Sequence, residues 1–458
     1  MMNDEPGAPC AHAGALTISS AGTIASARVY DAGEITSRPF EKAQRNPARR
    51  LSPGPRSKAR SMVARILPIL GITFIDILGF SILIPILPYF VQHFGASDLT
   101  VGLLFSTFAA CQFIAGPVWG NVSDRIGRKR VLIISQIGAT IGWTMLAYAG
   151  SLAVVFIARI IEGLSGGNIS VTQAYVADLV EPKDRARAFG YVGASFSAGI
   201  IFGPLLGGFL LAHYGFSAPF LAAAAIQFIT LLLTIFMLPE STSSAERSHV
   251  ATFADILRSL SDRTLAPLLI QIWAFSLSLY AWFGVLTLLF KEALHFNGSQ
   301  TSYFFASFGL VSVILQVGIV GGTNDRFGAR RTALLGIGSL LIGFLLVPLI
   351  HTIWSALPTI LLFAFGMAIA RPSLTALLTD RTPENQRGTI LGVSSALDNL
   401  SGVFMPPVST GVLGAFGPAW AGVPSAFWSV VALVLGLRNR TSNAPADDAL
   451  PPQAQESV

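Results

Sequence analysis

Five ionisable side chains lie inside long apolar runs of this 458-residue chain. They are Asp76, Arg159, Glu162, Arg371 and Asp398. Charged groups are costly in apolar surroundings, so residues of this kind are candidates for function rather than for packing. Loss of water disfavours the charged form of a carboxyl group, and a carboxyl group placed in this way can take up and release a proton. The five residues are therefore candidates for function, and the carboxyl groups among them for carrying a proton.

Three of these residues are the candidates for proton coupling. Asp76 lies about 16 Å into its apolar run, at 1.5 Å per residue, where it is either a proton carrier or an ionised group held by a cation such as Arg159. Glu162 follows Arg159 by three residues and shares its helix face. Glu162 is therefore either a partner of Arg159 or a second protonation site.

Arg371 and Asp398 are expected to form an ion pair. Arg371 precedes Asp380 by nine residues, or about 14 Å, and Asp398 follows Gly388 by ten residues, or about 15 Å. The two runs are consecutive and a short loop joins them, so the two charges lie at matching depths. A pair at this depth is far more tolerable than an isolated charge. The pair is either structural or part of the substrate cavity.

Twelve apolar runs contain these residues and must position them. Only 12% of the residues are charged, against about 25% in soluble domains, and each run has roughly the 20 residues that a helix needs to cross a bilayer. The runs are continuous rather than alternating, which argues against a membrane β-barrel. We therefore predict an all-α membrane protein with twelve transmembrane helices. The predicted spans are 66–90, 99–119, 131–149, 153–177, 187–211, 217–238, 265–290, 301–322, 333–351, 354–378, 388–413 and 417–437.

The basic residues between the runs indicate how the chain is oriented. After Met62, one set of connections collects nearly all of them, whereas the other set contains Lys291. Basic connections face the cytoplasm, and an even number of spans leaves both termini on one side. We therefore predict a multi-pass protein of the cell membrane with cytoplasmic termini. The net charge of +6 follows this pattern and does not indicate nucleic acid as a partner.

The chain repeats a charged loop. Residues 120–130 read GNVSDRIGRKR, and residues 321–331 read GGTNDRFGARR. A second spaced set also recurs, because Asp178, Pro182, Arg185 and Gly190 match Asp380, Pro383, Arg387 and Gly392. The repeats predict two pseudo-symmetric six-helix halves, related by an axis along the membrane normal, with the substrate path between them.

The repeated loop resembles the signature loop of the major facilitator superfamily, and the copy at 321–331 resembles it more weakly. The span at 187–211 carries glycines and a proline that are similar to the antiporter motif of drug–proton exporters, including the tetracycline-efflux group. These residues are Gly190, Gly199, Gly203, Pro204, Gly207 and Gly208. The segments around Asp76 and Arg159 are similar to the first and fourth helices of the same exporters. The resemblance covers residues 65–437 and implies the major facilitator fold.

The resemblance also implies a gate in the repeated loops, formed by Gly120, Asp124, Arg125, Gly127, Arg128, Asp178, Asp325 and Arg326. Asp124 is expected to face a helix N-terminus, and Arg128 is expected to pair with Asp178. By resemblance, such contacts hold the cytoplasmic gate closed in the outward-open state. The alternative is that the basic residues only set the topology of the chain.

The antiporter motif also has a direct physical interpretation. Gly199, Gly203 and Gly207 recur every four residues and form one bare stripe on a helix, which lets another helix approach closely. Pro204 removes a backbone hydrogen bond and bends the helix. The stripe is either plain packing or a determinant of transport direction, and the two roles are compatible.

Polar and charged residues within the spans are candidates for the substrate cavity, because a few polar groups in an apolar pocket suit amphiphilic ligands. The candidates are Asn168, Gln173, Gln271, Trp273, Arg371, Asp398 and Asn399. Each is equally suited to a hydrogen bond between helices.

The domain boundaries follow from composition. Residues 1–61 are polar and lack an apolar period, so we expect a disordered tail that transport does not need. The halves are expected at 62–238 and 265–437, with a cytoplasmic linker at 239–264. A second disordered tail is expected at 438–458.

The function predicted from these features is secondary active transport by alternating access. The favoured form is a proton-coupled antiporter that exports drugs or small amphiphilic metabolites. The alternatives are a proton-coupled importer of sugars or organic acids and a membrane sensor that transports nothing. No nucleotide loop, metal cluster or catalytic nucleophile motif indicates an enzyme or a cofactor. The expected partners are the substrate, protons and the bilayer, and the expected state is a monomer.

Overall fold

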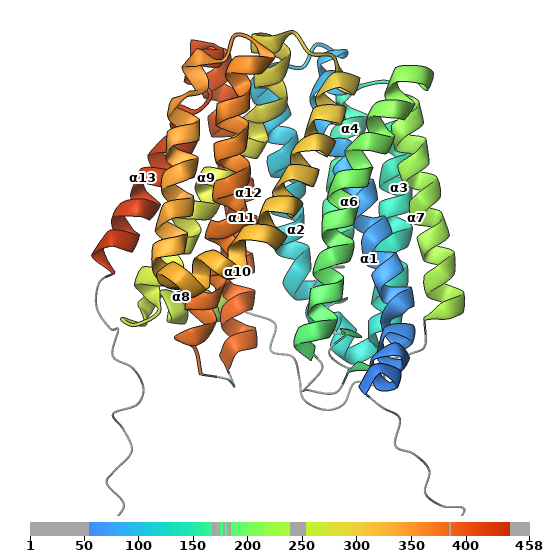
Figure 1. Ribbon diagram of the computed structural model, residues 1–458. Helices are drawn as coiled ribbons and strands as arrows, with labels where there is room; N and C mark the ends of the chain where they lie inside the picture. Colours follow the sequence, from blue (N-terminus) through green and yellow to red (C-terminus); the bar gives the residue numbers. More distant parts are fainter. Residues whose placement is uncertain are drawn as a thin grey trace, which may run out of the picture. The chain divides into compact units, whose positions relative to one another are not determined.

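The computed structural model describes residues 55–166, 172, 175, 176, 179, 180, 185–238, 253–383 and 386–439. Its long helices run side by side (Figure 1). The first half contains α1 (Pro55–Gln92), α2 (Asp98–Ile126), α3 (Arg128–Ala147), α4 (Leu152–Ser165), α6 (Arg185–Tyr214) and α7 (Ser217–Met237). A short helix, α8 (Phe253–Ser261), follows. The second half contains α9 (Ala266–Leu294), α10 (Gly298–Leu345), α11 (Ile353–Asp380), α12 (Arg387–Phe416) and α13 (Val423–Arg438), with short 3-10 turns at Val347–Leu349 and Pro418–Trp420.

The described helices follow the predicted spans, with two differences in their bounds. Within the described residues, nine helical segments, against twelve predicted, are long and apolar enough to cross a membrane. For the predicted span 153–177, α4 ends at Ser165 and most of the later residues lie outside the described part of the chain. The predicted spans at 301–322 and 333–351 both belong to α10, which Gly328 divides into two arms because its backbone is not helical. Helix α1 begins at Pro55, so the end of the segment expected to be a disordered tail is helical.

Large apolar side chains on the outer helices remain uncovered. Phe236 on α7 is 80% exposed and Trp354 on α11 is 77% exposed. Water would disfavour so many exposed apolar groups, whereas the acyl chains of a bilayer accept them. These faces are therefore the lipid-facing surfaces.

Each half uses the same pattern of neighbours. In the first half, α1 packs against α6 and α7, and α4 packs against α2 and α3. In the second half, α9 packs against α12 and α13, and α11 packs against α10. The halves meet where α2 packs on α12 and where α6 packs on α10. The matching patterns agree with the repeat seen in the sequence.

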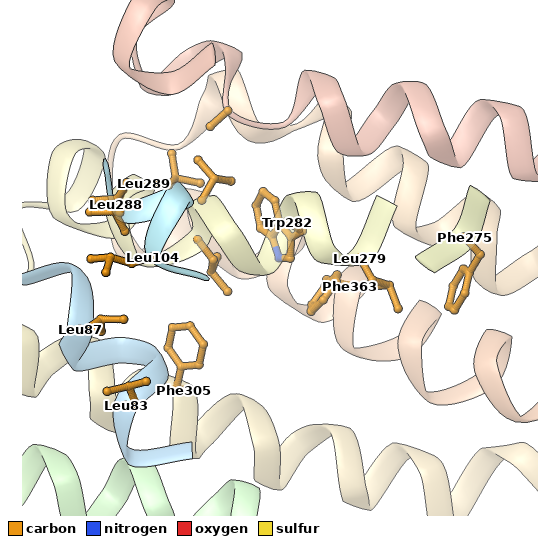
Figure 2. Packing of buried hydrophobic residues seen from close by; sticks show 14 of the residues in the cluster. Leu83, Leu87, Leu104, Phe275, Leu279, Trp282, Leu288, Leu289, Phe305 and Phe363 are labelled. Atoms are coloured by element: carbon orange, nitrogen blue, oxygen red, sulfur yellow. The ribbon is translucent and has the colours of Figure 1, made fainter. Parts of the chain in front are cut away.

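An apolar core joins the two halves. One buried cluster contains Leu83 and Leu87 of α1 together with Phe305 of α10 and Trp282 of α9 (Figure 2). Trp282 is 1% exposed, and its ring centroid lies 5.9 Å from that of Phe363 on α11. This core fixes the positions of the helices around the cavity described below.

The two ends of the helix bundle differ in charge. At one end lie the connections 93–97, 215–216 and 295–297, which contain no arginine, and we call it the arginine-poor end. The opposite end carries Arg125 and Arg326, and we call it the arginine-rich end.

Candidate functional site

Asp76 is held by a neighbouring helix of the same half. The side-chain amide of Gln227, on α7, donates a 3.0 Å hydrogen bond to Oδ1 of Asp76. Gln227 is buried and Asp76 is half-buried. Phe80 and Ile84 follow Asp76 at intervals of four residues on α1, so all three share one helix face. The Asp76 carboxyl group is thus fixed in orientation while part of it remains accessible.

Arg159 and Glu162 form a buried ion pair within α4. This confirms that Glu162 is an intrahelical partner of Arg159, while its role in proton coupling stays a prediction. The guanidinium carbon of Arg159 also lies 4.1 Å from the ring centroid of Phe108, which favours the cation. Oε1 of Glu162 and Nε of Arg159 are buried and have no hydrogen-bond partner among the described residues. The pair therefore retains unused hydrogen-bonding capacity.

Arg371 and Asp398 form the predicted ion pair between α11 and α12. The hydroxyl group of Ser276, on α9, donates a second bond to Asp398 through Oδ1. The Arg371 side chain is 48% exposed, whereas that of Asp398 is 9% exposed. Helices α9 and α11 therefore both bind the Asp398 carboxylate of α12, through Ser276 and Arg371.

A cavity of about 220 Å³ lies between the halves. It is mostly apolar, and its polar groups come from both halves. The lining residues with polar side chains are Gln112, Arg159, Tyr280 and Asn399, and the main apolar ones are Phe80, Phe105, Phe108 and Phe283. Aromatic walls with a few polar groups suit a flat amphiphilic molecule.

The glycine stripe of α6 packs directly against α1. A Cβ atom at Gly203 would lie 2.6 Å from the carbonyl oxygen of Leu78, and one at Gly199 would lie 2.9 Å from the amide nitrogen of the same residue. The hydroxyl group of Ser81 donates a 2.8 Å hydrogen bond to the carbonyl oxygen of Gly199. The close approach predicted from the spacing is therefore confirmed, and α1, which carries Asp76, is the helix that approaches.

The other motif glycines of α6 have different surroundings. Gly207 faces Ile82 and Ile86 of α1, whereas Gly208 faces α10 of the second half, where a Cβ atom would lie 2.8 Å from Cβ of Ser302. Nothing lies within 4 Å of a Cβ atom at Gly190. The motif therefore forms two contacts, one within the first half and one between the halves.

Each repeated loop turns at a glycine with the same backbone conformation. Gly127 has φ 99° and ψ 148°, and Gly328 has φ 76° and ψ 153°. Positive φ angles of this kind favour glycine because a side chain would clash with the backbone. Glycine is therefore needed at both positions for the turn.

A basic residue after each of these glycines binds the end of the last helix in its half. Lys129 donates to the carbonyl oxygen of Ile235 at 2.8 Å, and Arg330 donates to that of Gly436 at 2.9 Å. A cation is stabilising at a helix C-terminus, where carbonyl groups lack partners. The repeated loops thus tie α3 to α7 and the second arm of α10 to α13, a role beyond topology.

The proposed gate is described in part. Arg128 is buried and donates to the hydroxyl group of Ser123, which in turn donates to the carbonyl oxygen of Gly120 at 2.7 Å. Arg125 and Arg326 are exposed. Asp178 and the side chains of Asp124 and Asp325 lie outside the described residues, so the pairing of Arg128 with Asp178 stays a prediction.

A polar network joins the halves at the arginine-poor end. Lys291, on α9, donates to the side-chain oxygen of Gln92 on α1. The amide nitrogen of Gln92 donates in turn to Oδ1 of Asp98 at 2.9 Å. Nearby, the hydroxyl group of Tyr89 donates to the carbonyl oxygen of Phe296 at 2.8 Å. These contacts hold this end closed in the structure.

We expect Lys291→Met to weaken this closure, because it removes a charged hydrogen bond between α9 and α1. The readout is the rate at which a membrane-impermeant thiol reagent, added on the arginine-poor side, labels Ile84→Cys in a background without native cysteines. Labelling should accelerate several-fold in Lys291→Met and remain near the wild-type rate in Lys291→Arg, which keeps a cation. Equal rates in all three proteins would contradict a role in closure.

The comparisons with known proteins agree with this arrangement. The family model described as Major Facilitator Superfamily matches residues 69–319 and 268–456. The chain belongs to the major facilitator superfamily. This confirms the predicted all-α membrane fold with two six-helix halves. The major facilitator superfamily is a family of transporters, which agrees with the predicted transport function.

Several drug-resistance proteins are similar to this facilitator. The class C tetracycline resistance protein of Escherichia coli is 30% identical over 369 residues, covering 78% of this chain and 92% of that protein. Multidrug resistance protein 2 of Bacillus subtilis is 30% identical over 346 residues, covering 73% and 84%. The similarity to this group of exporters, which the sequence motifs predicted, is confirmed.

Solved structures share the fold of this facilitator. The human organic anion transporter MFSD10 (TETRAN) has a TM-score of 0.63 at 23% identity, covering 82% of this chain and 99% of that chain. A bacterial homolog of the human lysosomal transporter Spinster, in an inward-facing and occupied conformation, has a TM-score of 0.69 at 15% identity, covering 83% and 96%.

The predicted cavity residues have different positions in this facilitator. Asn399 lines the cavity, whereas Gln271 is buried against α13, where Asn439 donates to its side-chain oxygen at 3.4 Å. Trp273 lies two helical turns before Tyr280 on α9 and packs against Leu277 and its neighbours, outside the cavity lining. Both residues are polar groups used for packing between helices. Asn168 and Gln173 lie outside the described residues.

Some residues of the site were not predicted from the sequence. Gln112 and Tyr280 line the cavity, and Ser276 binds Asp398. All three are ordinary polar residues in apolar runs, and no spacing distinguishes them. Their positions depend on packing between helices that are far apart in the sequence.

Proposed function

We propose that this facilitator exports drug-like amphiphilic molecules across the cell membrane in exchange for protons. The observation that carries the proposal is the seam between α6 and α1, where the glycine-proline motif resembling that of exporters packs against the helix of Asp76. The export-type motif on α6 therefore packs against the same helix, α1, that carries the candidate proton carrier Asp76. The similarity to tetracycline and multidrug resistance proteins supports the same function.

Asp76 is the proton carrier in this proposal. It is the half-buried carboxyl group on the helix face that continues into the cavity lining at Phe80 and Ile84. Gln227 keeps the carboxyl group in place whether it is charged or neutral, because an amide can donate to either form. Arg159 and Glu162 provide a second charged site on the cavity wall.

Alternating access is the mechanism that fits this arrangement. The two halves are joined at the arginine-poor end by Lys291, Gln92 and Tyr89, and the substrate path lies between them. Opening this end requires those bonds to break, while the repeated loops at the arginine-rich end close the other side. In this proposal, the arginine-rich end and both termini face the cytoplasm.

The substrate class follows from the cavity and from the relatives. The walls are mainly aromatic, with Gln112, Tyr280 and Asn399 as polar groups. Such a cavity favours planar amphiphiles, and tetracycline is the compound that the names of several relatives specify. We therefore propose tetracycline-like or dye-like molecules as substrates.

The direction of coupling can be tested with purified protein in liposomes. An antiporter lets protons leave an acidic interior while substrate enters. Tetracycline or ethidium should therefore accumulate in vesicles with an acidic interior, and a protonophore should abolish the accumulation. A proton-coupled importer would show the opposite result, with accumulation only when the exterior is acidic. No response to either gradient would reject proton coupling.

A further inference from the structure

The ion pair between Arg371 and Asp398 is asymmetric. Asp398 is bonded through Oδ1 to Ser276 and through Oδ2 to Arg371, and its side chain is 9% exposed. The Arg371 side chain is 48% exposed and uses one terminal nitrogen for the pair. A guanidinium group has five N–H donors, so most of its donors have no partner among the residues that the structure describes. The Asp398 carboxylate is therefore buried, whereas the Arg371 guanidinium group is accessible to a ligand.

The exposed side of Arg371 is expected to face the space between the halves rather than lipid. It lies nine residues before the end of α11, about 14 Å from the surface, where exposure to lipid would be costly. Tyr280 and Asn399, which line the cavity, lie next to the pair, because Tyr280 is within electrostatic range of both charges and Asn399 follows Asp398. The pair therefore lies at the margin of the cavity on the arginine-rich side.

This arrangement selects for one sign of charge. A ligand that enters from the arginine-rich end meets a guanidinium group before it reaches the aromatic walls. A carboxylate can accept two parallel bonds from such a group. A cation would instead have to displace Arg371 to reach Asp398. The site therefore fits an amphiphile with one negative group and an apolar body.

We infer that Arg371 binds the negative group of the transported molecule, with Asp398 and Ser276 as positioning residues. The inference rests on the proposed export function and specifies its substrate class as organic anions, carboxylates above all. Asp398 orients Arg371 when no ligand is bound. It also lowers the free-energy cost of placing a cation within the membrane span. When the ligand binds, its carboxylate shares the guanidinium group with Asp398.

The test uses two fluorescent probes that differ by one charge, dansylglycine and its methyl ester. Binding to the purified full-length protein in lipid nanodiscs is measured by energy transfer from tryptophan. The wild-type protein should bind the acid more tightly than the ester. In Arg371→Gln the affinity for the acid should fall about tenfold or more, whereas the affinity for the ester should change little.

Changes at Asp398 separate ligand binding from a structural role. Asp398→Asn should tighten binding of the acid, because Arg371 no longer shares its charge with a carboxylate. A purely structural pair would instead lose affinity for both probes in both variants. The double variant Arg371→Gln/Asp398→Asn removes both charges together, so that no lone charge remains to disturb folding, and it should show no preference for the acid.

Two results would overturn the inference. One is a wild-type protein that does not prefer the acid, and the other is a double variant that keeps the preference. Transport of tetracycline driven by a proton gradient, measured on the same proteins, tests the export function separately. Intact tetracycline transport with no preference for the acid would reject the anion site alone, and loss of both would also reject the proposed function.

Discussion

Asp76→Asn is expected to abolish substrate accumulation driven by a proton gradient while ligand binding persists. An amide has the shape of the protonated carboxyl group but cannot release a proton, so the coupling step is lost. Gln227 donates to the oxygen atom that the two side chains share, and the hydrogen bond at 3.0 Å can remain. The change therefore removes proton exchange with little disturbance of packing.

The measurement compares three activities of the same protein in liposomes. Accumulation against a gradient should disappear in Asp76→Asn, whereas downhill exchange of labelled substrate and equilibrium binding should remain. Asp76→Glu should recover part of the driven transport because it restores a carboxyl group.

A carboxylate outside the spans provides the matched control. Hydrogen bonds from the side chain and backbone of Thr264 lower the pKa of Asp262, so this exposed residue stays ionised near neutral pH. Asp262→Asn should therefore leave proton-driven transport unchanged. Normal driven transport in Asp76→Asn would remove Asp76 from the mechanism and leave Glu162 as the candidate.

Gly203→Ala is expected to cause the second large effect, a severe loss of transport. The new Cβ atom would lie 2.6 Å from the carbonyl oxygen of Leu78, which is backbone and cannot rotate away. Helices α1 and α6 must then separate, and overpacking of this kind costs about 1–3 kcal/mol. A difference of that size between the two states of a transporter shifts their ratio by about 5- to 150-fold.

The same helix offers a control with the same chemical change. No described residue lies within 4 Å of a Cβ atom at Gly193, so Gly193→Ala should retain near wild-type transport and thermal stability. The two variants are compared at equal amounts of membrane-inserted protein. Equal transport by the two variants would show that transport does not require close contact between α1 and α6. The proposed role of the α6 glycine motif in export would then lose its support.

Much of the fold could be predicted from the sequence because it depends on local patterns. Apolar runs of membrane length gave the helices, and the repeated loops gave the two halves. The backbone at Gly127 and Gly328 shows why the repeat was visible, since both turns require glycine. The start of α1 was placed too late, because polar residues before Met62 can extend a helix into water.

The site could be predicted only where depth or spacing carried the information. Arg371 and Asp398 were paired correctly because both lie at a depth that the spans define. The stripe from Gly199 to Gly207 was visible in the sequence, but its partner α1 was not. Gln271 and Trp273 were candidates for the cavity and equally for contacts between helices, because buried polar residues in spans look alike until the face of each helix is known.

The two ion pairs constrain their helices in different ways. Arg159 and Glu162 belong to one helix, so the geometry of α4 fixes their separation and no tilt of that helix can stretch it. Arg371 and Asp398 belong to different helices, and Ser276 adds a third, so any slide of α9, α11 and α12 past one another pulls on a charged bond. Relative movement of these three helices is therefore coupled to a charged bond, whereas movement of α4 against its neighbours leaves its own ion pair intact.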